Sequence, residues 1–88
     1  MRFEFGPTKA ATNLKKHGVS FADAEAVFED ALALHKTDPD AQGEERFVAI
    51  GLGSAGNVLV VVYTFRESSI RLISARRATR QEARAYAS

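Results

Sequence analysis

The chain has 88 residues, of which 45% are hydrophobic and 26% charged, with a formal net charge of +1. This length predicts one domain, residues 1–88, around a single core. The absence of cysteine excludes a disulfide scaffold and a cysteine-based zinc site. The longest apolar run, Val58 to Val62, is far shorter than the roughly 20 residues of a membrane span, so we expect a cytoplasmic protein.

The two halves of the chain differ in charge. Residues 1–45 carry five Lys or Arg against nine Asp or Glu, whereas residues 46–88 carry seven Arg and no Lys against two Glu. Because the planar donors of arginine match phosphate oxygens, the second half is expected to meet an anionic partner. The alternative is that several arginines pair with the acidic N-terminal half of the same chain.

The N-terminus is predicted to form a short strand and then a helix. Arg2 to Phe5 alternates charged and aromatic residues, as a strand with one buried face does. Pro7 suits the first turn of a helix that covers about Thr8 to His17. Gly18 is expected to end this helix in the left-handed conformation.

A second helix is predicted next, with Ser20 as its N-cap. Its apolar stripe runs from Phe21 to Ala31 at helical spacing, so this helix should lie along the core. The segment from Ala31 to His35 fits either the end of the helix or the start of a strand. The pattern leaves both open.

The remaining half is predicted to form three strands and a last helix. The strands are Arg46–Leu52, Val58–Phe65 and Ile70–Ala75, joined by connections of hairpin length. The last helix begins at Thr79, where Thr79 and Glu82 have the spacing of a capping box.

The predicted order β-α-α-β-β-β-α indicates an α+β fold. We expect an antiparallel meander with the first two helices on one face and the last helix partly covering the other. Strand alternation is expected to place Arg71 and Arg76 on opposite faces. The partly covered face should hold a shallow depression lined by arginine.

No metal site and no cofactor site is predicted. His17 and His35 lie in different elements and lack the spacing of a ligand pair. The segment from Gly51 to Gly56 mimics GxGxxG, but it joins two antiparallel strands and does not open a helix. The chemistry must therefore come from other side chains.

A set of cations remains, and no acidic neighbour is predicted for them. If they converge, they would hold a phosphodiester and stabilise the pentacoordinate transition state of its cleavage. RNA needs no metal for this reaction, because its own 2′-OH is the nucleophile. The set consists of Arg46, Arg66, Arg71 and Arg76 on strands or at their ends, and of Lys9, Lys16 and His17 on the first helix.

Several of these residues also have structural interpretations. His17 lies in the last helical turn, where a cation stabilises the negative end of the helix dipole. Tyr63 could stack on a base, but it shares a face with apolar neighbours, which favours core packing. Arg66 lies at the end of the same strand, on the opposite face, which it shares with Thr64. It is the strongest single functional candidate.

Four segments of the chain together carry a family resemblance. They are Lys9-x-x-x-Asn13-x-x-Lys16-His17-Gly18-Val19-Ser20-Phe21, Glu45-Arg46, Tyr63-Thr64-x-Arg66 and Arg71-x-Ile73-Ser74-Ala75-Arg76. In this order they closely resemble the BrnT toxins of bacterial type II toxin–antitoxin systems, and the resemblance covers nearly the whole chain. It implies a RelE-like fold, a ribonuclease activity that inhibits translation, and neutralisation by a BrnA-type ribbon-helix-helix antitoxin. It also implies a complex of two toxins and two antitoxins that represses its own promoter, with DNA contacted mainly by the antitoxin.

The resemblance marks positions without assigning roles, so the roles come from chemistry. Where the family pattern has Trp-Asp, this chain has Phe5-Gly6. We expect phosphate binding and transition-state stabilisation by one group and proton transfer by another. The catalytic candidates are Arg66, Arg46 and Arg76 for phosphate and His17 or Lys9 for protons, and the RNA-binding candidates are Phe5, Asn13, Lys16, Thr64 and Arg71.

Two functions remain open at this point. The first is an endoribonuclease toxin that works without metal and leaves 2′,3′-cyclic phosphate ends. The second is a catalytically inactive toxin-like binding module, an antitoxin partner or co-repressor whose arginine face docks an acidic antitoxin segment. Direct DNA binding is disfavoured by the modest net charge and by the lack of a recognition helix.

Overall fold

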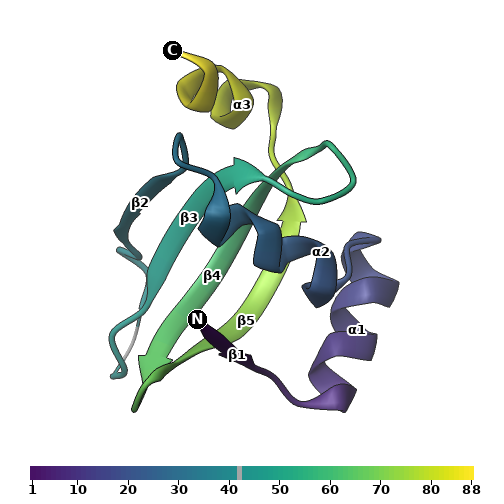
Figure 1. Cartoon of the computed structure of the whole chain (residues 1–88), viewed down its shortest axis with the longest axis vertical. Coiled ribbons are helices and arrows are strands. Elements are labelled where there is room, and N and C mark those ends of the chain that lie inside the picture. The colour runs from purple at the N-terminus through teal and green to yellow at the C-terminus, as the bar shows by residue number, and fades with distance from the viewer. Residues whose placement is uncertain (42) are drawn as a thin grey trace.

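The computed structural model describes residues 1–41 and 43–88. Within them, a five-stranded sheet packs with three α-helices and one short 3-10 helix (Figure 1). This arrangement confirms the predicted α+β class. The elements are β1 (Arg2–Glu4), α1 (Pro7–His17), α2 (Phe21–Glu25), η1 (Ala26–Glu29), β2 (Leu34–Thr37), β3 (Phe47–Leu52), β4 (Val58–Arg66), β5 (Ser69–Arg77) and α3 (Arg80–Ala87).

The strands follow the order β1-β5-β4-β3-β2 across the sheet. β3, β4 and β5 form the predicted antiparallel meander. At one edge, the segment whose helix or strand character was left open leads into β2, which pairs antiparallel with β3. At the other edge, β1 pairs in parallel with the first residues of β5. The meander is thus widened by one strand on each side.

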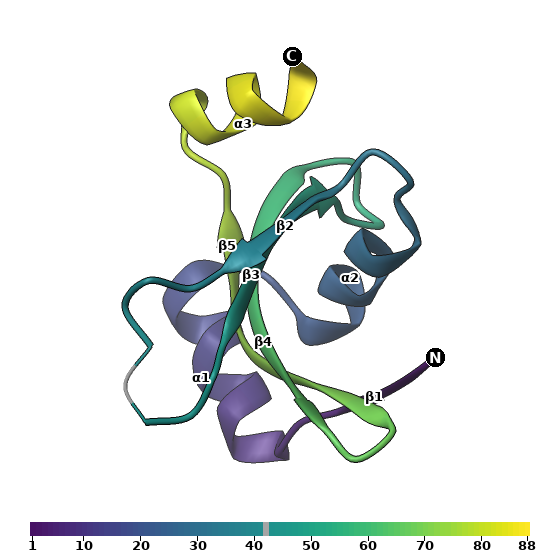
Figure 2. The ribbon, with the colours of Figure 1, turned by 90° about the vertical axis from the view of Figure 1, so that its left-hand side faces the viewer.

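The core lies between one face of the sheet and the helical segments that follow β1. α2 and η1 cover this face, and Figure 2 shows α2 on one side of the sheet when it is viewed from the β2 edge. α1 lies at the β5 edge of the sheet, on the side away from α2 in Figure 2, and α3 lies near one end of the sheet. The buried core consists of Val19, Phe21, Ala24, Val27, Ala49, Leu59, Val61, Tyr63, Ile70, Leu72 and Ala75.

Local sequence signals set the helix boundaries. Gly18 ends α1 with φ of 71°, a left-handed conformation that glycine adopts without a Cβ clash. The Ser20 hydroxyl accepts a hydrogen bond from the Asp23 N–H at 3.0 Å, so Ser20 is the N-cap of α2 as predicted. The second helix is shorter than its apolar stripe suggested, because α2 ends at Glu25 and the chain continues as a 3-10 turn to Glu29.

Asn13 fastens α1 to the outer edge of β5. Its side-chain Nδ2 donates to the carbonyls of Val19 and Ala75, both at 2.9 Å. Its Oδ1 accepts from the Ala75 N–H at 3.1 Å. The amide therefore pairs with both backbone groups of Ala75 much as a neighbouring strand would. β1 reaches only as far as Arg71 along this edge, so Asn13 takes over where β1 ends.

Two polar contacts join α3 to the rest of the fold, one to β5 and one to Asp30 in the segment between η1 and β2. The predicted capping box is present, because Thr79 and Glu82 exchange side chain to backbone hydrogen bonds. The Glu82 carboxylate also accepts two hydrogen bonds from the Arg76 guanidinium, at 2.8 and 2.9 Å. At the other end of the helix, the Tyr86 hydroxyl donates to the Asp30 carboxylate at 2.5 Å, which lowers the pKa of Asp30.

Replacement of Asn13 should destabilise the fold. Asn13→Ala leaves the Ala75 backbone and the Val19 carbonyl without their buried partner, which costs about 2–3 kcal/mol of unfolding free energy. Urea denaturation followed by circular dichroism measures the difference. Thr12→Ala, one position away on the exposed side of α1, serves as control, and equal stability of the two variants would refute the structural role of Asn13.

The contact between Arg76 and Glu82 should be visible in the pH dependence of stability. The hydrogen bonds from Arg76 lower the pKa of Glu82 from 4.5 to about 2. Its contribution is therefore complete above pH 4.5 and is lost as the pH falls from 4.5 toward 2. Glu82→Gln should cost about 1 kcal/mol at pH 7, after allowance for solvent screening, and almost nothing near pH 2.

Thermal denaturation of both proteins at a series of pH values checks this prediction. Glu44→Gln, an exposed residue of the segment between β2 and β3, is the matched control. A difference between wild type and Glu82→Gln that stays constant from pH 7 to pH 2 would contradict the account.

Candidate nucleic-acid interface

The face of the sheet opposite the core carries most of the predicted strand cations. We call it the open face. On β4 the open face includes Thr64 and Arg66, since Leu59, Val61 and Tyr63 alternate with them toward the core. Phe47 pairs with Tyr63, and this register places Arg46, just before β3, next to Thr64.

A β-bulge changes the predicted orientation of one arginine. Val62 pairs with Ser74 and Tyr63 pairs with Leu72, so Ile73 is an extra residue in β5. The extra residue breaks the alternation of side chains along the strand. The expectation that Arg71 and Arg76 lie on opposite faces is therefore wrong. Thr64 and Val60, their partners on β4, are an even number of residues apart, so both arginines lie on the open face.

An acidic residue, Glu4, lies between two of these arginines. Parallel pairing of β1 with β5 places Glu4 beside Arg71, and Thr64 flanks Arg71 on the other side. Glu4 Oε1 lies 3.0 Å from Arg71 Nη1 and 4.0 Å from Arg66 Nε. The expectation that these cations have no acidic neighbour is therefore wrong for Arg66 and Arg71, and the alternative of pairing with the acidic N-terminal half holds for them. The charged residues of β1 were the available signal, but the parallel pairing could not be read from β1 alone.

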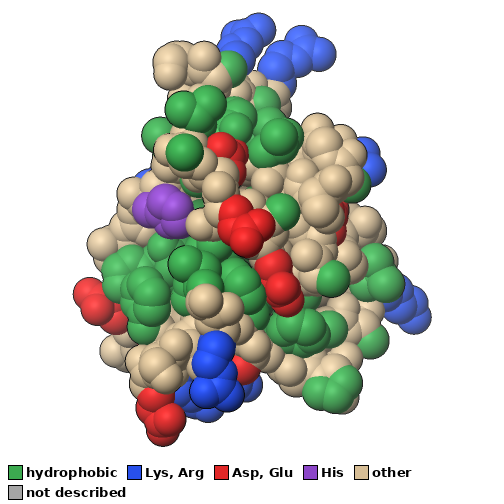
Figure 3. Space-filling model, viewed as in Figure 1, with side chains coloured by type: hydrophobic (Ala, Val, Ile, Leu, Met, Phe, Trp, Pro, Cys, Tyr) green, Lys and Arg blue, Asp and Glu red, His purple; other side chains and the backbone are tan. Residues whose placement is uncertain are grey.

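Of Arg66, Arg71 and Arg76, which each lie within 4.0 Å of a carboxylate, Arg66 is the most exposed, with 58% of its side chain accessible. Figure 3 shows Lys and Arg side chains emerging at the lower end of the molecule, where β4 turns into β5. The Arg46 side chain is only partly exposed, and its Nε is buried without a hydrogen-bond partner among the described residues. Arg66 thus exposes most of its side chain, and Arg46 keeps a buried Nε without a partner among the described residues.

The predicted depression exists on the open face, but its lining is mostly not arginine. A hollow of about 480 Å³ lies between α3 and the segment after β2. Arg76 is its one arginine among the described residues, and Glu82 holds both arms of that guanidinium. The hydrogen bonds to Glu82 raise the pKa of Arg76. The floor is apolar and the rim is mixed: Lys36, Asp38, Pro39, Asp40, Val48, Ile50, Val60, Val62, Ser74, Gln81 and Ala85 complete the lining.

The predicted helix cations gather around a second hollow of about 250 Å³. Lys9, Lys16 and His17 project from successive turns of α1, and Ser74 and Ile73 of β5 close the other side. Ser74 also lines the larger hollow, so the two hollows adjoin at this residue. The bulge at Ile73 thus brings the helix cations next to the open face.

Three predicted RNA-binding residues have side chains engaged with the protein itself. The Asn13 amide is occupied by Val19 and Ala75, and the Thr64 hydroxyl donates to the Glu45 carbonyl at 2.8 Å. The Phe5 ring packs edge-on against Phe21 on the helix side, at 5.1 Å between centroids. These three side chains therefore contact the protein itself and stabilise the structure around the site.

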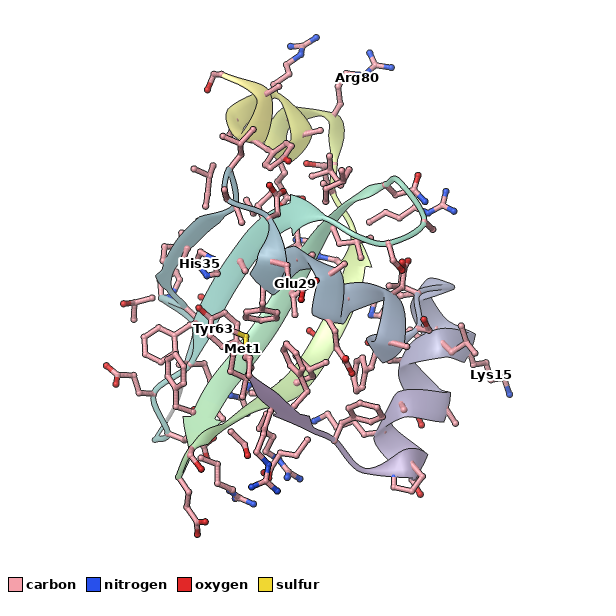
Figure 4. All side chains as sticks on the ribbon, in the orientation of Figure 1. Met1, Lys15, Glu29, His35, Tyr63 and Arg80 are labelled. Carbon is pink, nitrogen blue, oxygen red and sulfur yellow. The ribbon has the colours of Figure 1, made fainter. Side chains whose placement is uncertain are left out.

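An aromatic patch lies on the other side of the sheet. The Tyr63 hydroxyl and His35 Nδ1 are 2.9 Å apart, and both residues are labelled in Figure 4. Burial raises the pKa of Tyr63. Phe65, at the end of the row, is 60% exposed, and Figure 3 shows hydrophobic side chains gathered beside the histidine. We define the aromatic patch as Phe28, His35, Phe47, Tyr63 and Phe65. The centroids of neighbouring rings in this patch are 4.9 to 6.0 Å apart.

Two kinds of feature are absent from the residues that the structure describes. No group of three or more His, Asp or Glu side chains there could hold a metal ion. No helix there has the length and apolar character needed to cross a membrane.

Comparison with known proteins agrees with this arrangement. A family model described as the ribonuclease toxin BrnT of type II toxin–antitoxin systems matches residues 5–82. The crystal structure of the Brucella abortus ribonuclease toxin BrnT is similar, with a TM-score of 0.69 and 28% sequence identity over 91% of this chain and 99% of that chain. No curated protein sequence matches. The resemblance noted from the sequence is confirmed, and the chain belongs to the BrnT family of ribonuclease toxins of type II toxin–antitoxin systems.

Proposed function

We propose that this protein is an endoribonuclease that cleaves RNA without a metal ion, by attack of the 2′-OH on the adjacent phosphate. One observation carries the proposal. The sheet register brings Arg46, Arg66 and Arg71, which belong to three different segments, onto one open face. At Ser74 this face adjoins the hollow of the α1 cations. A phosphodiester on this face would meet guanidinium groups from more than one side.

The chemistry of RNA cleavage suits such a site. The 2′-OH and the phosphate belong to the same nucleotide, so the protein needs only to orient them and move protons. Negative charge on the phosphate oxygens rises as the pentacoordinate transition state forms. Guanidinium groups fixed by strands can match that charge without rearranging, and arginine presents two donors in one plane. Arg66 is our first choice for this role, with Arg46 beside it.

The α1 hollow supports a second part of the site. Lys9, Lys16 and His17 line it together, so it would attract a phosphate of the same RNA strand. His17 or Lys9 would also supply the proton that the departing 5′ oxygen requires. Arg76 could join only after Glu82 releases it, because both arms of its guanidinium are engaged.

Membership of a type II toxin–antitoxin family implies an antitoxin partner. We propose a ribbon-helix-helix antitoxin of the BrnA type, in a complex of two toxins and two antitoxins that contacts operator DNA through the antitoxin. Inhibition of translation would then follow from RNA cleavage when the antitoxin is lost. The aromatic patch supports the presence of a protein partner, since Phe65 keeps 60% of its surface exposed in the free chain.

A catalytically inactive binding module is the second candidate. Two of the predicted site arginines already form ion pairs within the chain: Arg71, an RNA-binding candidate, with Glu4, and Arg76, a catalytic candidate, with Glu82. The chain also has Phe5-Gly6 where the family pattern has Trp-Asp. In such a module the open face would bind an acidic segment of the antitoxin, and the purified protein would leave RNA intact.

Substitution of Arg66 distinguishes the two candidates. Arg66→Ala should lower the rate of cleavage of single-stranded RNA by at least about 100-fold, because one preorganised donor to the transition state is lost. The rate is measured with purified protein in the presence of EDTA. Arg80→Ala is the control, since Arg80 projects away from the sheet on α3 (Figure 4) and should leave the rate unchanged. Equal rates for the two variants would remove Arg66 from the site.

A substitution in the aromatic patch tests the partner surface. Phe65→Ser should weaken binding to the antitoxin by about tenfold or more, because an exposed aromatic anchor is removed. Co-purification and calorimetry with the antitoxin encoded beside this toxin measure the affinity. Leu32→Ser, another exposed apolar residue but outside the defined patch, is the control. An unchanged affinity for Phe65→Ser would place the antitoxin elsewhere.

A further inference from the structure

Glu4 is a carboxylate held within the arginine cluster of the open face. Parallel pairing with β5 fixes its backbone opposite Arg71. Its Oε1 accepts a hydrogen bond from Arg71 Nη1 at 3.0 Å and lies 4.0 Å from Arg66 Nε. Among the described residues, the polar contacts of this side chain all go to Oε1, and 36% of the side chain is exposed. Oε2 is thus available to a ligand.

The other carboxylates that contact sheet residues or helices are more fully engaged. The two oxygens of Glu82 are both bonded to Arg76. Asp30 accepts from Tyr86 and from two backbone N–H groups. Asp23 binds Ser54 and the Ala55 N–H in the hairpin between β3 and β4. Of these acids, Glu4 combines a place on the arginine face with an uncommitted oxygen.

The reaction itself demands a base at such a place. In RNA the attacking 2′-oxygen is on the carbon next to the one that carries the 3′-phosphate. A base that takes the 2′-OH proton must therefore lie beside the groups that bind this phosphate. Guanidinium groups at Arg66 and Arg71 are such groups, and the Glu4 carboxylate lies between them. A base remote from both could not reach the hydroxyl of a bound phosphodiester.

We propose that Glu4 is the general base of RNA cleavage by this protein, an inference that rests on the proposed ribonuclease function. The Glu4 carboxylate takes the proton of the 2′-OH while the 2′-oxygen forms a bond to phosphorus. The bond from phosphorus to the 5′-oxygen breaks, and that oxygen takes a proton from the α1 cations or from water. The products are a 2′,3′-cyclic phosphate and a 5′-OH, and Glu4 returns its proton to solvent.

In this mechanism the guanidinium groups of Arg66 and Arg71 act both before RNA binds and when RNA is bound. Before the reaction they orient the Glu4 carboxylate through the contacts to its Oε1. When RNA binds, phosphate oxygens share the donors of Arg66 and Arg71, which frees the carboxylate toward the hydroxyl. If the ion pair only joined β1 to β5, the rate of the chemical step would not depend on the charge of residue 4.

The test compares Glu4→Gln, Glu4→Asp and the exposed control Glu29→Gln with wild type. Each protein is assayed in EDTA on a mixed-sequence single-stranded RNA oligonucleotide under single-turnover conditions. Binding is measured separately with the 2′-deoxy version of the same oligonucleotide, which cannot react. We expect Glu4→Gln to lose at least about 100-fold in the cleavage rate, with binding equal to wild type or tighter because a negative charge is gone. Glu4→Asp should recover part of the rate.

Three results would overturn the inference. Cleavage by Glu4→Gln close to the wild-type rate, together with loss of cleavage in Arg66→Ala, removes Glu4 as base and leaves the proposed function intact. A parallel loss of stability, binding and cleavage in Glu4→Gln and Glu4→Asp assigns Glu4 a structural role. Failure of wild type to cleave RNA defeats the proposed function and the Glu4 inference together.

Discussion

The outer edge of β5 is the constraint on which the remaining architecture depends. Backbone groups on a strand edge must find partners, and a meander of three strands would leave this edge bare. β1 pairs with its first part, from Ser69 to Arg71, and the Asn13 side chain pairs with Ala75 farther along. The same two contacts bring Glu4 and the α1 cations next to the strand arginines. The contacts that complete the outer edge of β5 therefore also assemble the candidate site.

The bulge at Ile73 completes this arrangement. Without the extra residue, strict alternation would separate Arg71 from Arg76 on the two faces of the sheet. With it, Ser74 comes to lie between the hollow of the α1 cations and the hollow beside α3. The core side of β5 accommodates the bulge by a three-residue step from Leu72 to Ala75, and the opposite side of the strand carries both arginines. Bulges of this kind commonly re-aim side chains near functional sites.

The local elements of this fold were predictable because their signals are local. Ser20, Gly18 and Thr79 act through neighbours in sequence, so their caps could be read from the chain. Parallel pairing of β1, the bulge at Ile73 and the contact between Arg76 and Glu82 depend on groups distant in sequence or on register. A pattern of residue types does not encode register directly. The family motif marked most of the positions, whereas their geometry had to come from the structure.

The proposed function depends on cleavage of RNA by attack of its own 2′-OH. If the 2′-OH is the nucleophile, the ends of the products record it. The most direct measurement is mass spectrometry of the fragments that purified protein releases from single-stranded RNA in the presence of EDTA. We predict 2′,3′-cyclic phosphate on one side of each cut and a 5′-hydroxyl on the other. Fragments with 3′-hydroxyl and 5′-phosphate ends, or RNA that stays intact, would contradict the account.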